Sequence, residues 1–327
     1  MKRRFQFRAE SWPLARPFRI SRGTKSSAEV VIVEIKENGQ IGHGECVPYP
    51  RYGESCETVM AILSDITSVI ENGLDREALR ERLPPGAARN ALDCALWDLE
   101  GKLAGRRVWE LAQLKAPRSV ITAETVALDS PERMAGAAAA LRSRPLLKIK
   151  VGREEVFERL AAVREAAPAA RLIVDANEGW DASVLSNVAP QLLALGVEMI
   201  EQPLPAEVDG ALDGYRCPVP LCADESVHTL ADLDRIATRY QLINIKLDKA
   251  GGLSAAIDLL RGSLARGLGV MVGCMVGTSL SMAPAMLLAP YASVVDLDGP
   301  LWLAKDRTPS MIFQDGYVYP PEPALWG

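Results

Sequence analysis

The sequence predicts an α/β protein in which a barrel of parallel strands follows an α+β capping domain. From Ser119 onward, eight short β-rich runs alternate with Ala/Leu-rich stretches of helical spacing, which is the pattern of consecutive βα units. Polar residues close five of these runs at intervals of 22 to 26 residues, the length of one strand plus one helix. Eight successive units of this kind indicate a closed barrel with its working face at the C-terminal ends of the strands.

The capping domain is expected over residues 1–117 and the barrel over residues 118–300. In the first domain, β-rich runs at Val30–Ile35 and Gln40–Glu45 flank Asn38-Gly39, a strong hairpin signal. Helical spacing follows a Pro/Tyr-rich loop at residues 48–53. Residues 301–327 are too few for a ninth unit, and we expect them to pack back on the capping domain.

Eight barrel strands are expected in chain order. They centre on Ile121–Val126, Leu146–Val151, Leu172–Asp175, Val197–Glu201, Leu221–Asp224, Ile243–Leu247, Val270–Gly273 and Val294–Asp298. An open doubly wound sheet is the alternative. The chain has neither a GxGxxG fingerprint nor a GxxxxGK[ST] loop, so a nucleotide cofactor is not indicated.

Composition narrows the class of protein further. The 42 acidic residues outnumber 37 basic ones for a net charge of -5, which argues against a nucleic-acid partner. Two histidines cannot build a three-histidine zinc site, and six cysteines without a CxxC pair favour reduced thiols. No apolar run reaches the length of a membrane span. We therefore expect a soluble, cytoplasmic protein without a membrane partner.

Three acidic residues close consecutive predicted strands: Asp175, Glu201 and Asp224. Each one alone would fit a strand-end cap or an ion-pair partner. Together, three carboxylates without counter-charge would repel one another and raise their pKa values, so a divalent cation is their natural partner. Oxygen ligands with few histidines favour Mg²⁺.

Lysines lie on both sides of this acidic group. Lys148 and Lys150 share one strand face because they are two residues apart, and we expect each ammonium to lower the pKa of the other. A solvated pair at a strand end is the alternative. Lys246 closes the strand across the barrel. One lysine could remove a proton from a metal-chelated carbon acid and the other return it on the opposite face.

This constellation resembles the muconate-lactonizing subgroup of the enolase superfamily along essentially the whole chain. The resemblance implies a modified TIM barrel, (β/α)7β, with Lys150 and Lys246 as paired acid/base catalysts. It also implies that Lys148 contacts the substrate carboxylate. By the same resemblance, one Mg²⁺ per subunit would be held by Asp175, Glu201 and Asp224.

The eighth strand ends in Asp296-Leu297-Asp298-Gly299-Pro300, and this Asp-x-Asp is similar to the motif with which dipeptide epimerases hold a free α-ammonium. A turn-forming Asp-Gly is the alternative. Residues 48–55 and 86–93 and the Arg22-Gly23 pair also resemble that group. The resemblance places Thr125 and Cys274 in the substrate site. Arg22 could bind a substrate carboxylate, or could belong to a solvated loop.

The implied activity is Mg²⁺-dependent epimerisation of a dipeptide at the α-carbon of its C-terminal residue, by two-base proton transfer through an enediolate. The matching segments favour L-Ala-L-Glu/L-Ala-D-Glu, a substrate of murein peptide recycling, and a homo-oligomer is possible. The alternatives are an epimerase of other dipeptides, an o-succinylbenzoate synthase and an N-acylamino acid racemase. A catalytically silent ligand-binding barrel is the alternative from another class.

Overall fold

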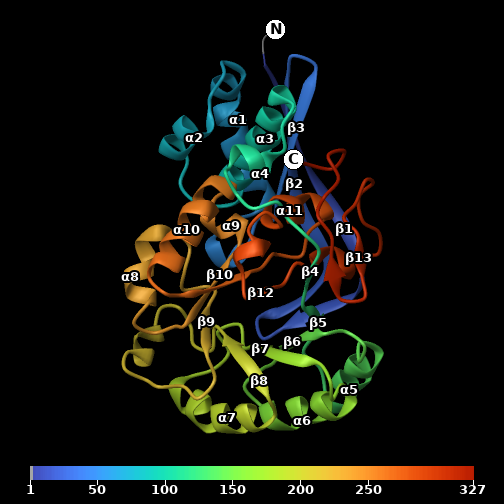
Figure 1. Ribbon diagram of the computed structural model, residues 1–327, viewed down its shortest axis with the longest axis vertical. Coiled ribbons are helices and arrows are strands. Elements are labelled where there is room, and N and C mark those ends of the chain that lie inside the picture. Colours follow the sequence, from blue (N-terminus) through green and yellow to red (C-terminus); the bar gives the residue numbers. More distant parts are fainter. Residues whose placement is uncertain (1–2) are drawn as a thin grey trace.

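A computed structural model describes residues 3–327 as a three-stranded antiparallel sheet with its helices and an eight-stranded parallel sheet curled into a barrel (Figure 1). The first two residues of the predicted capping domain lie outside this described part. Among residues 3–327, no helix combines the length and the apolar character needed to cross a membrane.

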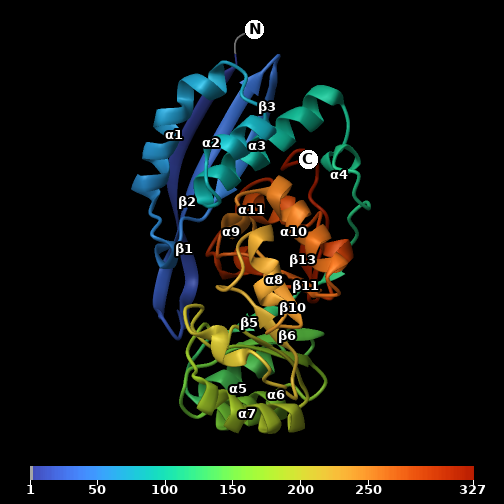
Figure 2. The same cartoon turned by 90° about the vertical axis from the view of Figure 1, so that its left-hand side faces the viewer.

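The antiparallel sheet consists of β1 (Arg4–Ile20), β2 (Gly23–Glu37) and β3 (Gln40–Cys46). The predicted hairpin is present between β2 and β3, where Asn38 and Gly39 take φ values of 48° and 83°. Both residues need positive φ in the tight turn that Asn-Gly favours. The β1–β2 hairpin is much longer, and its tip reaches the loops of the barrel in both side views (Figures 1 and 2).

Four helices follow this sheet: α1 (Cys56–Glu71), α2 (Arg76–Arg82), α3 (Ala87–Ala104) and α4 (Val108–Leu111). Helices α1 and α3 pack against the sheet, and α2 and α4 pack against α3. Helix α3 is buried along most of its length because it packs against both β3 and the barrel helices. Gly42 and Gly44 permit the close approach of β3, since a Cβ at either position would collide with a carbonyl oxygen of α3. The capping unit is thereby fixed against the barrel.

The barrel strands follow one another in chain order, each parallel to the next. They are β5 (Glu124–Val126), β6 (Leu146–Lys150), β7 (Arg171–Asp175), β8 (Val197–Glu201), β9 (Leu221–Ala223), β10 (Leu242–Ile245), β11 (Gly269–Val272) and β12 (Val294–Val295). The Ala123 N–H donates to the Val295 carbonyl at 2.8 Å and joins the first strand segment to the last. This arrangement confirms the predicted barrel.

The helices between these strands are α5 (Pro131–Ala140), α6 (Val156–Ala166), α7 (Ala182–Ala194), α8 (Leu233–Ile236), α9 (Leu247–Ala250), α10 (Leu253–Ala265) and α11 (Ser279–Ala285). One connection departs from the regular pattern, because only a 3₁₀ turn, Asp209–Leu212, lies between β8 and β9. Prolines at 203, 205, 218 and 220 explain the missing α-helix, since proline removes backbone donors and blocks helical conformations.

The barrel interior is layered. A buried apolar cluster fills one level, with one residue from each of seven strand segments: Ala123, Leu146, Ile173, Met199, Cys222, Met271 and Val294. Side chains two residues further along a strand point to the same face and lie one level closer to its C-terminal end. That next level holds polar residues at most of these positions: Thr125, Lys148, Asp175, Glu201, Asp224 and Asp296. The polar layer therefore rests on an apolar floor.

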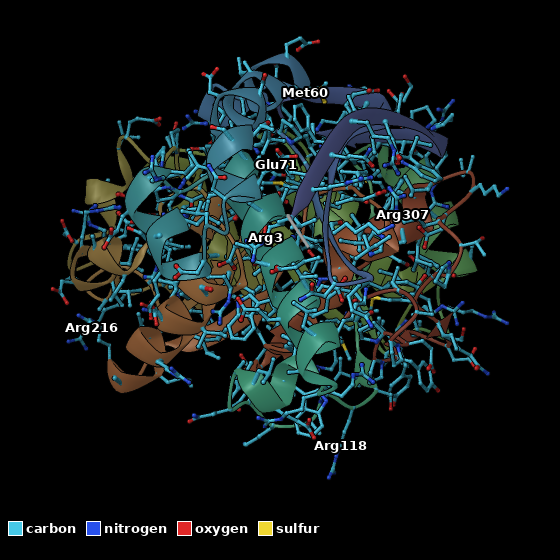
Figure 3. All side chains as sticks on the ribbon, turned by 90° about the horizontal axis from the view of Figure 1, so that it is seen from above. Arg3, Met60, Glu71, Arg118, Arg216 and Arg307 are labelled. Atoms are coloured by element: carbon cyan, nitrogen blue, oxygen red, sulfur yellow. The ribbon has the colours of Figure 1, made fainter. Side chains whose placement is uncertain are left out.

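The C-terminal segment lies against both units. Its strands β13 (Phe313–Gln314) and β14 (Tyr317–Val318) form a small sheet with β4 (Val120–Ile121). Arg307 lies beside the blue strands in Figure 3 and pairs with Glu10 of β1 at 2.7 Å. The Trp326 indole donates to the carbonyl of Cys94 in α3. The exact domain boundaries at residues 117 and 300 stay a prediction.

Candidate active site

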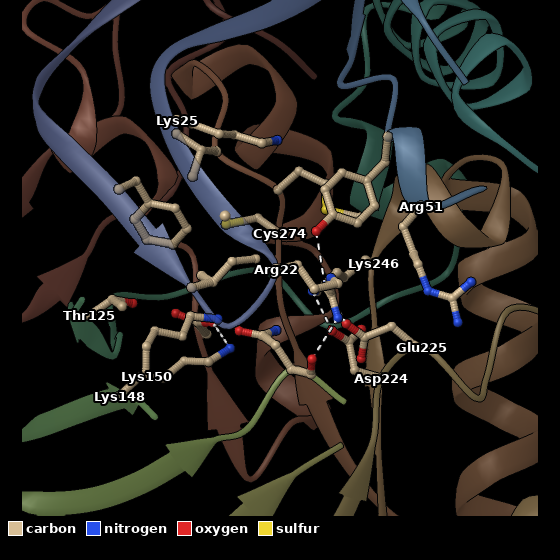
Figure 4. A pocket seen from close by; sticks show the side chains of 18 of the residues that line it. Arg22, Lys25, Arg51, Thr125, Lys148, Lys150, Asp224, Glu225, Lys246 and Cys274 are labelled. Carbon is tan, nitrogen blue, oxygen red and sulfur yellow. Dashed lines mark hydrogen bonds and ion pairs between the residues drawn. The ribbon is translucent and has the colours of Figure 1, made fainter. Parts of the chain in front are cut away.

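A cavity of about 470 Å³ lies at the C-terminal ends of the strands, between the barrel and the capping sheet (Figure 4). From the barrel it is lined by Thr125, Lys148, Lys150, Asp224, Lys246, Cys274, Asp296 and Asp298. From the capping unit it is lined by Phe18, Ile20, Arg22, Lys25, Tyr49 and Tyr52, among others. The cavity thus gathers most of the residues singled out in the sequence. Asp175 and Glu201 contact its lysines without lining it.

Lys148 is at the centre of the acidic group. Its Nζ lies 2.7 Å from Glu201 Oε2, 2.7 Å from Asp296 Oδ2 and 3.1 Å from Asp175 Oδ2. Burial alone would lower the pKa of Lys148, but these carboxylates raise it well above its ordinary value. The expectation that the Lys148–Lys150 pair lowers the pKa of Lys148 is therefore wrong, because the facing strands supply more negative charge than Lys150 supplies positive charge.

Lys150 and Lys246 each hold a carboxylate of the polar layer. Lys150 Nζ lies 2.6 Å from Asp175 Oδ2, and Lys246 Nζ lies 2.7 Å from Asp224 Oδ2. Burial opposes the charge of Lys246, yet Asp224 raises the pKa of this lysine well above its ordinary value. Strands β7, β8 and β9 lie between β6 and β10 in the barrel. The two ammonium groups therefore enter the cavity from opposite walls.

The three predicted metal ligands are buried, and their pKa values shift in different directions. Burial favours the neutral form of each, yet Lys150 and Lys148 lower the pKa of Asp175, and Lys246 and Lys249 lower that of Asp224. For Glu201, burial and then the charge of Asp175 raise the pKa to about 7. The predicted mutual repulsion therefore acts on Glu201, while neighbouring lysines outweigh it at both aspartates.

These side chains fit an oxygen-liganded cation by their chemistry rather than by their present spacing. Within residues 3–327, no three Asp, Glu, His or Cys side chains converge closely enough to hold a metal ion as they stand. Glu201 Oε2 is buried and touches Lys148 but accepts no hydrogen bond, whereas Oε1 accepts one from Asn244 at 2.7 Å. A hard cation prefers such carboxylate oxygens. The donor set therefore suits Mg²⁺ once the lysines that contact these carboxylates yield their positions.

The Asp-x-Asp pair at the eighth strand divides into two environments. Asp296 is ion-paired with Lys148, whereas Asp298 accepts hydrogen bonds from the Thr125 N–H at 2.8 Å and the Trp302 indole at 3.3 Å. Both bonds reach Oδ2, and Asp298 has no ion-pair partner among residues 3–327. Burial and then the charge of Asp296 raise the pKa of Asp298 to about 6.

Two arginines of the capping loops bind acidic residues of the barrel. Arg22 contacts Glu225 at 2.7 Å and Glu178 at 3.0 Å. Arg51 contacts Glu178 at 2.8 Å and Glu207 at 2.6 Å. Arg22 therefore has two carboxylate partners within the chain, and its predicted contact with a substrate carboxylate stays a prediction.

Lys25 is a second cation at the same wall of the cavity (Figure 4). Its Nζ lies 4.9 Å from the ring centroid of Tyr49, and no carboxylate of residues 3–327 pairs with it. Burial, and then the neighbouring charges of Arg22 and Lys246, lower the pKa of Lys25. Lys25 is thus a cavity-lining cation without a carboxylate partner in the described part of the chain.

The remaining predicted residues are also at the cavity. Thr125 and Cys274 line it, and burial raises the pKa of the Cys274 thiol well above its ordinary value. Sequence reasoning missed Glu225 and Asn244, although each has a local signal. Glu225 directly follows Asp224, and Asn244 lies two residues before Lys246 on the same strand face.

The fold is a parallel barrel beneath an antiparallel cap. Its strand ends carry opposed lysines and a row of buried carboxylates. Together these features define an enolase-type barrel protein. The chain belongs to the mandelate racemase/muconate lactonizing enzyme family. Residues 2–112 match the N-terminal domain of that family, and residues 133–324 match the enolase C-terminal domain-like family.

Two curated relatives cover nearly the whole chain. The L-Ala-D/L-Glu epimerase of Escherichia coli (strain K12) is 48% identical over 95% of this chain and 97% of its own length. The N-acetyl-D-glutamate racemase of a Pseudoalteromonas species is 44% identical over 91% of this chain and 95% of its own. Both relatives are named for reactions at a glutamate residue.

Two solved structures share the whole fold. One is an enolase-family protein of Agrobacterium tumefaciens with homology to dipeptide epimerases, bound to sodium and L-Ala-L-Glu. It is 47% identical to this chain with a TM-score of 0.98, and the match covers 99% of this chain and 100% of that protein. The dipeptide epimerase of Enterococcus faecalis V583, complexed with Mg and L-Leu-L-Tyr, is 28% identical with a TM-score of 0.91, covering 98% of both chains.

Proposed function

We propose that this protein is an isomerase that epimerises dipeptides at the α-carbon of their C-terminal residue, with L-Ala-L-Glu/L-Ala-D-Glu as substrate. The observation that carries the proposal is the pair of lysines, Lys150 and Lys246, that enter one cavity from opposite walls. The likeness to the L-Ala-D/L-Glu epimerase of E. coli supports the choice of dipeptide.

Inversion needs a proton acceptor on one face of the α-carbon and a donor on the other. In our proposal Lys150 and Lys246 share these roles, so the assignment of base and acid reverses with the direction of the reaction. Such a positioned acid or base contributes roughly 10²- to 10⁴-fold to the rate. Their carboxylate partners, Asp175 and Asp224, hold each Nζ at a fixed position in the cavity wall.

We assign Asp175, Glu201 and Asp224 as the residues that hold Mg²⁺, and Lys148 as a contact of the substrate carboxylate. When bound, Mg²⁺ supplies positive charge to the substrate carboxylate and so stabilises the negative charge that develops when the α-proton leaves. Glu201 supports this assignment because its buried Oε2 is held by the Lys148 ammonium at 2.7 Å, so this oxygen already contacts a positive charge.

The two ends of the dipeptide match the charges of the cavity. Asp298, and Asp296 with it, would hold the α-ammonium, while Thr125 and Cys274 line the substrate site beside them. Lys25, with Arg22, would bind the glutamate side chain at the cap. We also propose a cytoplasmic role in murein peptide recycling, which the six free cysteines support because disulfides are uncommon in reducing compartments.

The second candidate is racemisation of an N-acylated glutamate, which the Pseudoalteromonas relative favours. The structure bears on this candidate through Asp296: Lys148 pairs with it at 2.7 Å, so within residues 3–327 only Asp298 of the two aspartates lacks a cation. An N-acylated substrate has no ammonium to bind, so the two candidates differ in whether Asp298 matters.

The test is proton exchange in D₂O with Mg²⁺, followed by NMR at the glutamate α-position. We expect L-Ala-L-Glu to lose its α-proton signal and yield L-Ala-D-Glu, and dialysis against a chelator to stop both changes. N-acetyl-L-glutamate and L-Ala-L-Leu are run in parallel. Exchange of N-acetyl-L-glutamate without exchange of L-Ala-L-Glu would replace the dipeptide proposal by the second candidate.

A further inference from the structure

Trp302 lies behind the ammonium-binding end of the cavity. It ends the 3₁₀ turn Gly299–Trp302 directly after the Asp-x-Asp pair, and it is 2% exposed. Its indole N–H donates to Asp298 Oδ2, the oxygen that also accepts the backbone N–H of Thr125. Both donors therefore engage one oxygen of this carboxylate, and the other is left for a ligand.

The indole ring is held by the capping sheet. The ring of Phe18 packs edge-on against it with centroids 4.6 Å apart at 75°, and the Arg16 guanidinium lies 4.4 Å from its centroid. Both residues belong to β1. The backbone of this strand is tied to the same segment, because the Ala304 N–H donates to the Pro13 carbonyl at 2.8 Å. Trp302 consequently has little freedom to turn its N–H away from Asp298.

Asp298 is the acidic residue of this pair that lacks a cation. Lys148 pairs with Asp296 at 2.7 Å, while Asp298 has no ion-pair partner within residues 3–327. An ionised carboxylate buried to this degree needs hydrogen-bond donors to stay charged. The Trp302 indole and the Thr125 amide both donate to it.

We propose that Trp302 is a positioning residue that selects substrates with a free α-ammonium. It fixes Asp298 Oδ2 from behind and thereby turns the other carboxylate oxygen toward the cavity. This role rests on the proposed function, because it assigns the ammonium of the dipeptide to Asp298. It also links selectivity to the capping sheet, since Phe18 both supports the indole and lines the cavity.

The test compares two ligands that differ only in the ammonium: L-Ala-L-Glu and N-propionyl-L-glutamate. Their dissociation constants are measured by calorimetry, in Mg²⁺-containing buffer, for the full-length wild type and for Trp302→Phe, which removes the N–H and keeps a ring against Phe18. Trp326→Phe is the matched control, because Trp326 is equally buried and donates its indole N–H to the Cys94 carbonyl, away from the cavity.

We expect Trp302→Phe to weaken L-Ala-L-Glu about tenfold, the size of a hydrogen bond to a charged group, and N-propionyl-L-glutamate less than twofold. In an Asp298→Asn background the same substitution should have no further effect. Trp326→Phe should leave the ratio of the two affinities unchanged.

Equal weakening of both ligands, or no change in either, would overturn the proposal. Thermal melting of each variant identifies a loss of folding, and in that case Asp298→Asn alone still reports whether this carboxylate distinguishes the two ligands. If it does not, the proposal fails. The proposed function fails on a different result, namely no α-proton exchange by the wild type.

Discussion

Lys148 and Asp296 form a buried ion pair between β6 and the end of β12, with Nζ 2.7 Å from Oδ2. The same ammonium also touches Glu201 and Asp175. One lysine thus connects the proposed metal ligands to the proposed ammonium site. Binding of a cation on one side and of a dipeptide on the other must redistribute the contacts of this single charge.

Asp296→Asn tests this connection. The substitution removes the negative charge that Lys148 and a substrate ammonium would share, so we expect KM for L-Ala-L-Glu to rise at least tenfold. Activity toward N-acyl glutamate substrates, where present, should change little. Steady-state kinetics on both substrates provides the measurement. Asp306→Asn is the control, because Asp306 accepts a hydrogen bond from the Ser279 N–H away from the cavity. An equal loss of activity on both substrates would show that Asp296 has only a structural role.

Substitution of either opposed lysine should abolish epimerisation. Lys150→Ala and Lys246→Ala each remove one acid or base, and we expect epimerisation to fall by about 10²- to 10⁴-fold or more. Because the other lysine remains, each variant should retain deuterium exchange from one enantiomer at most. NMR in D₂O with L-Ala-L-Glu and L-Ala-D-Glu measures both rates. Wild-type epimerisation by either variant would contradict the two-base scheme.

Lys25→Met should reduce binding of an acidic side chain specifically. The substitution removes an unpaired cation at the cavity and keeps the length of the side chain. We expect KM for L-Ala-L-Glu to rise about tenfold while KM for L-Ala-L-Gln changes less than twofold. Lys36→Met, on the same capping sheet but outside the lining residues, is the control. If Arg22→Met, and not Lys25→Met, raised KM for L-Ala-L-Glu selectively, Arg22 would be the residue that binds the acidic side chain.

Stability should depend on pH through Asp248, which joins the barrel to the cap. Asp248 Oδ1 accepts hydrogen bonds from the Val47 N–H at 3.0 Å and the Asn90 amide at 2.8 Å. Burial raises the pKa of Asp248 to about 7. The folded state therefore binds a proton that the unfolded state has released, and this contribution to stability is lost as pH rises from about 4 to about 7.

Asp248→Asn keeps an acceptor at this position and removes the titration. We expect its free energy of unfolding, relative to wild type, to increase by a few kcal/mol between pH 5 and pH 7.5. Urea unfolding at both pH values measures this difference. A difference that stays constant with pH would show that Asp248 titrates at its ordinary pKa in the folded protein.

Patterns along the chain predict the barrel and the polar layer. Strand side chains alternate in direction, so the spacing of Lys148 and Lys150 predicts that both lie on the inner face. Parallel strands end at one edge, which brought Asp175, Glu201 and Asp224 to the same level of the barrel. Hydrophobic periodicity and strand spacing are local signals, and local signals can be read along the chain.

The ion-pair partners of these charged groups depend on how distant segments pack. Lys148 pairs with Asp296 across 148 positions of chain and Arg22 with Glu225 across 203, and no local pattern encodes such partners. These contacts reversed the expected pKa shift of Lys148 and gave Arg22 partners within the chain. The same contacts leave Lys25 and Asp298 without ion-pair partners among residues 3–327. Electrostatic pairing depends on distances in space, which the fold sets only after distant segments have packed together.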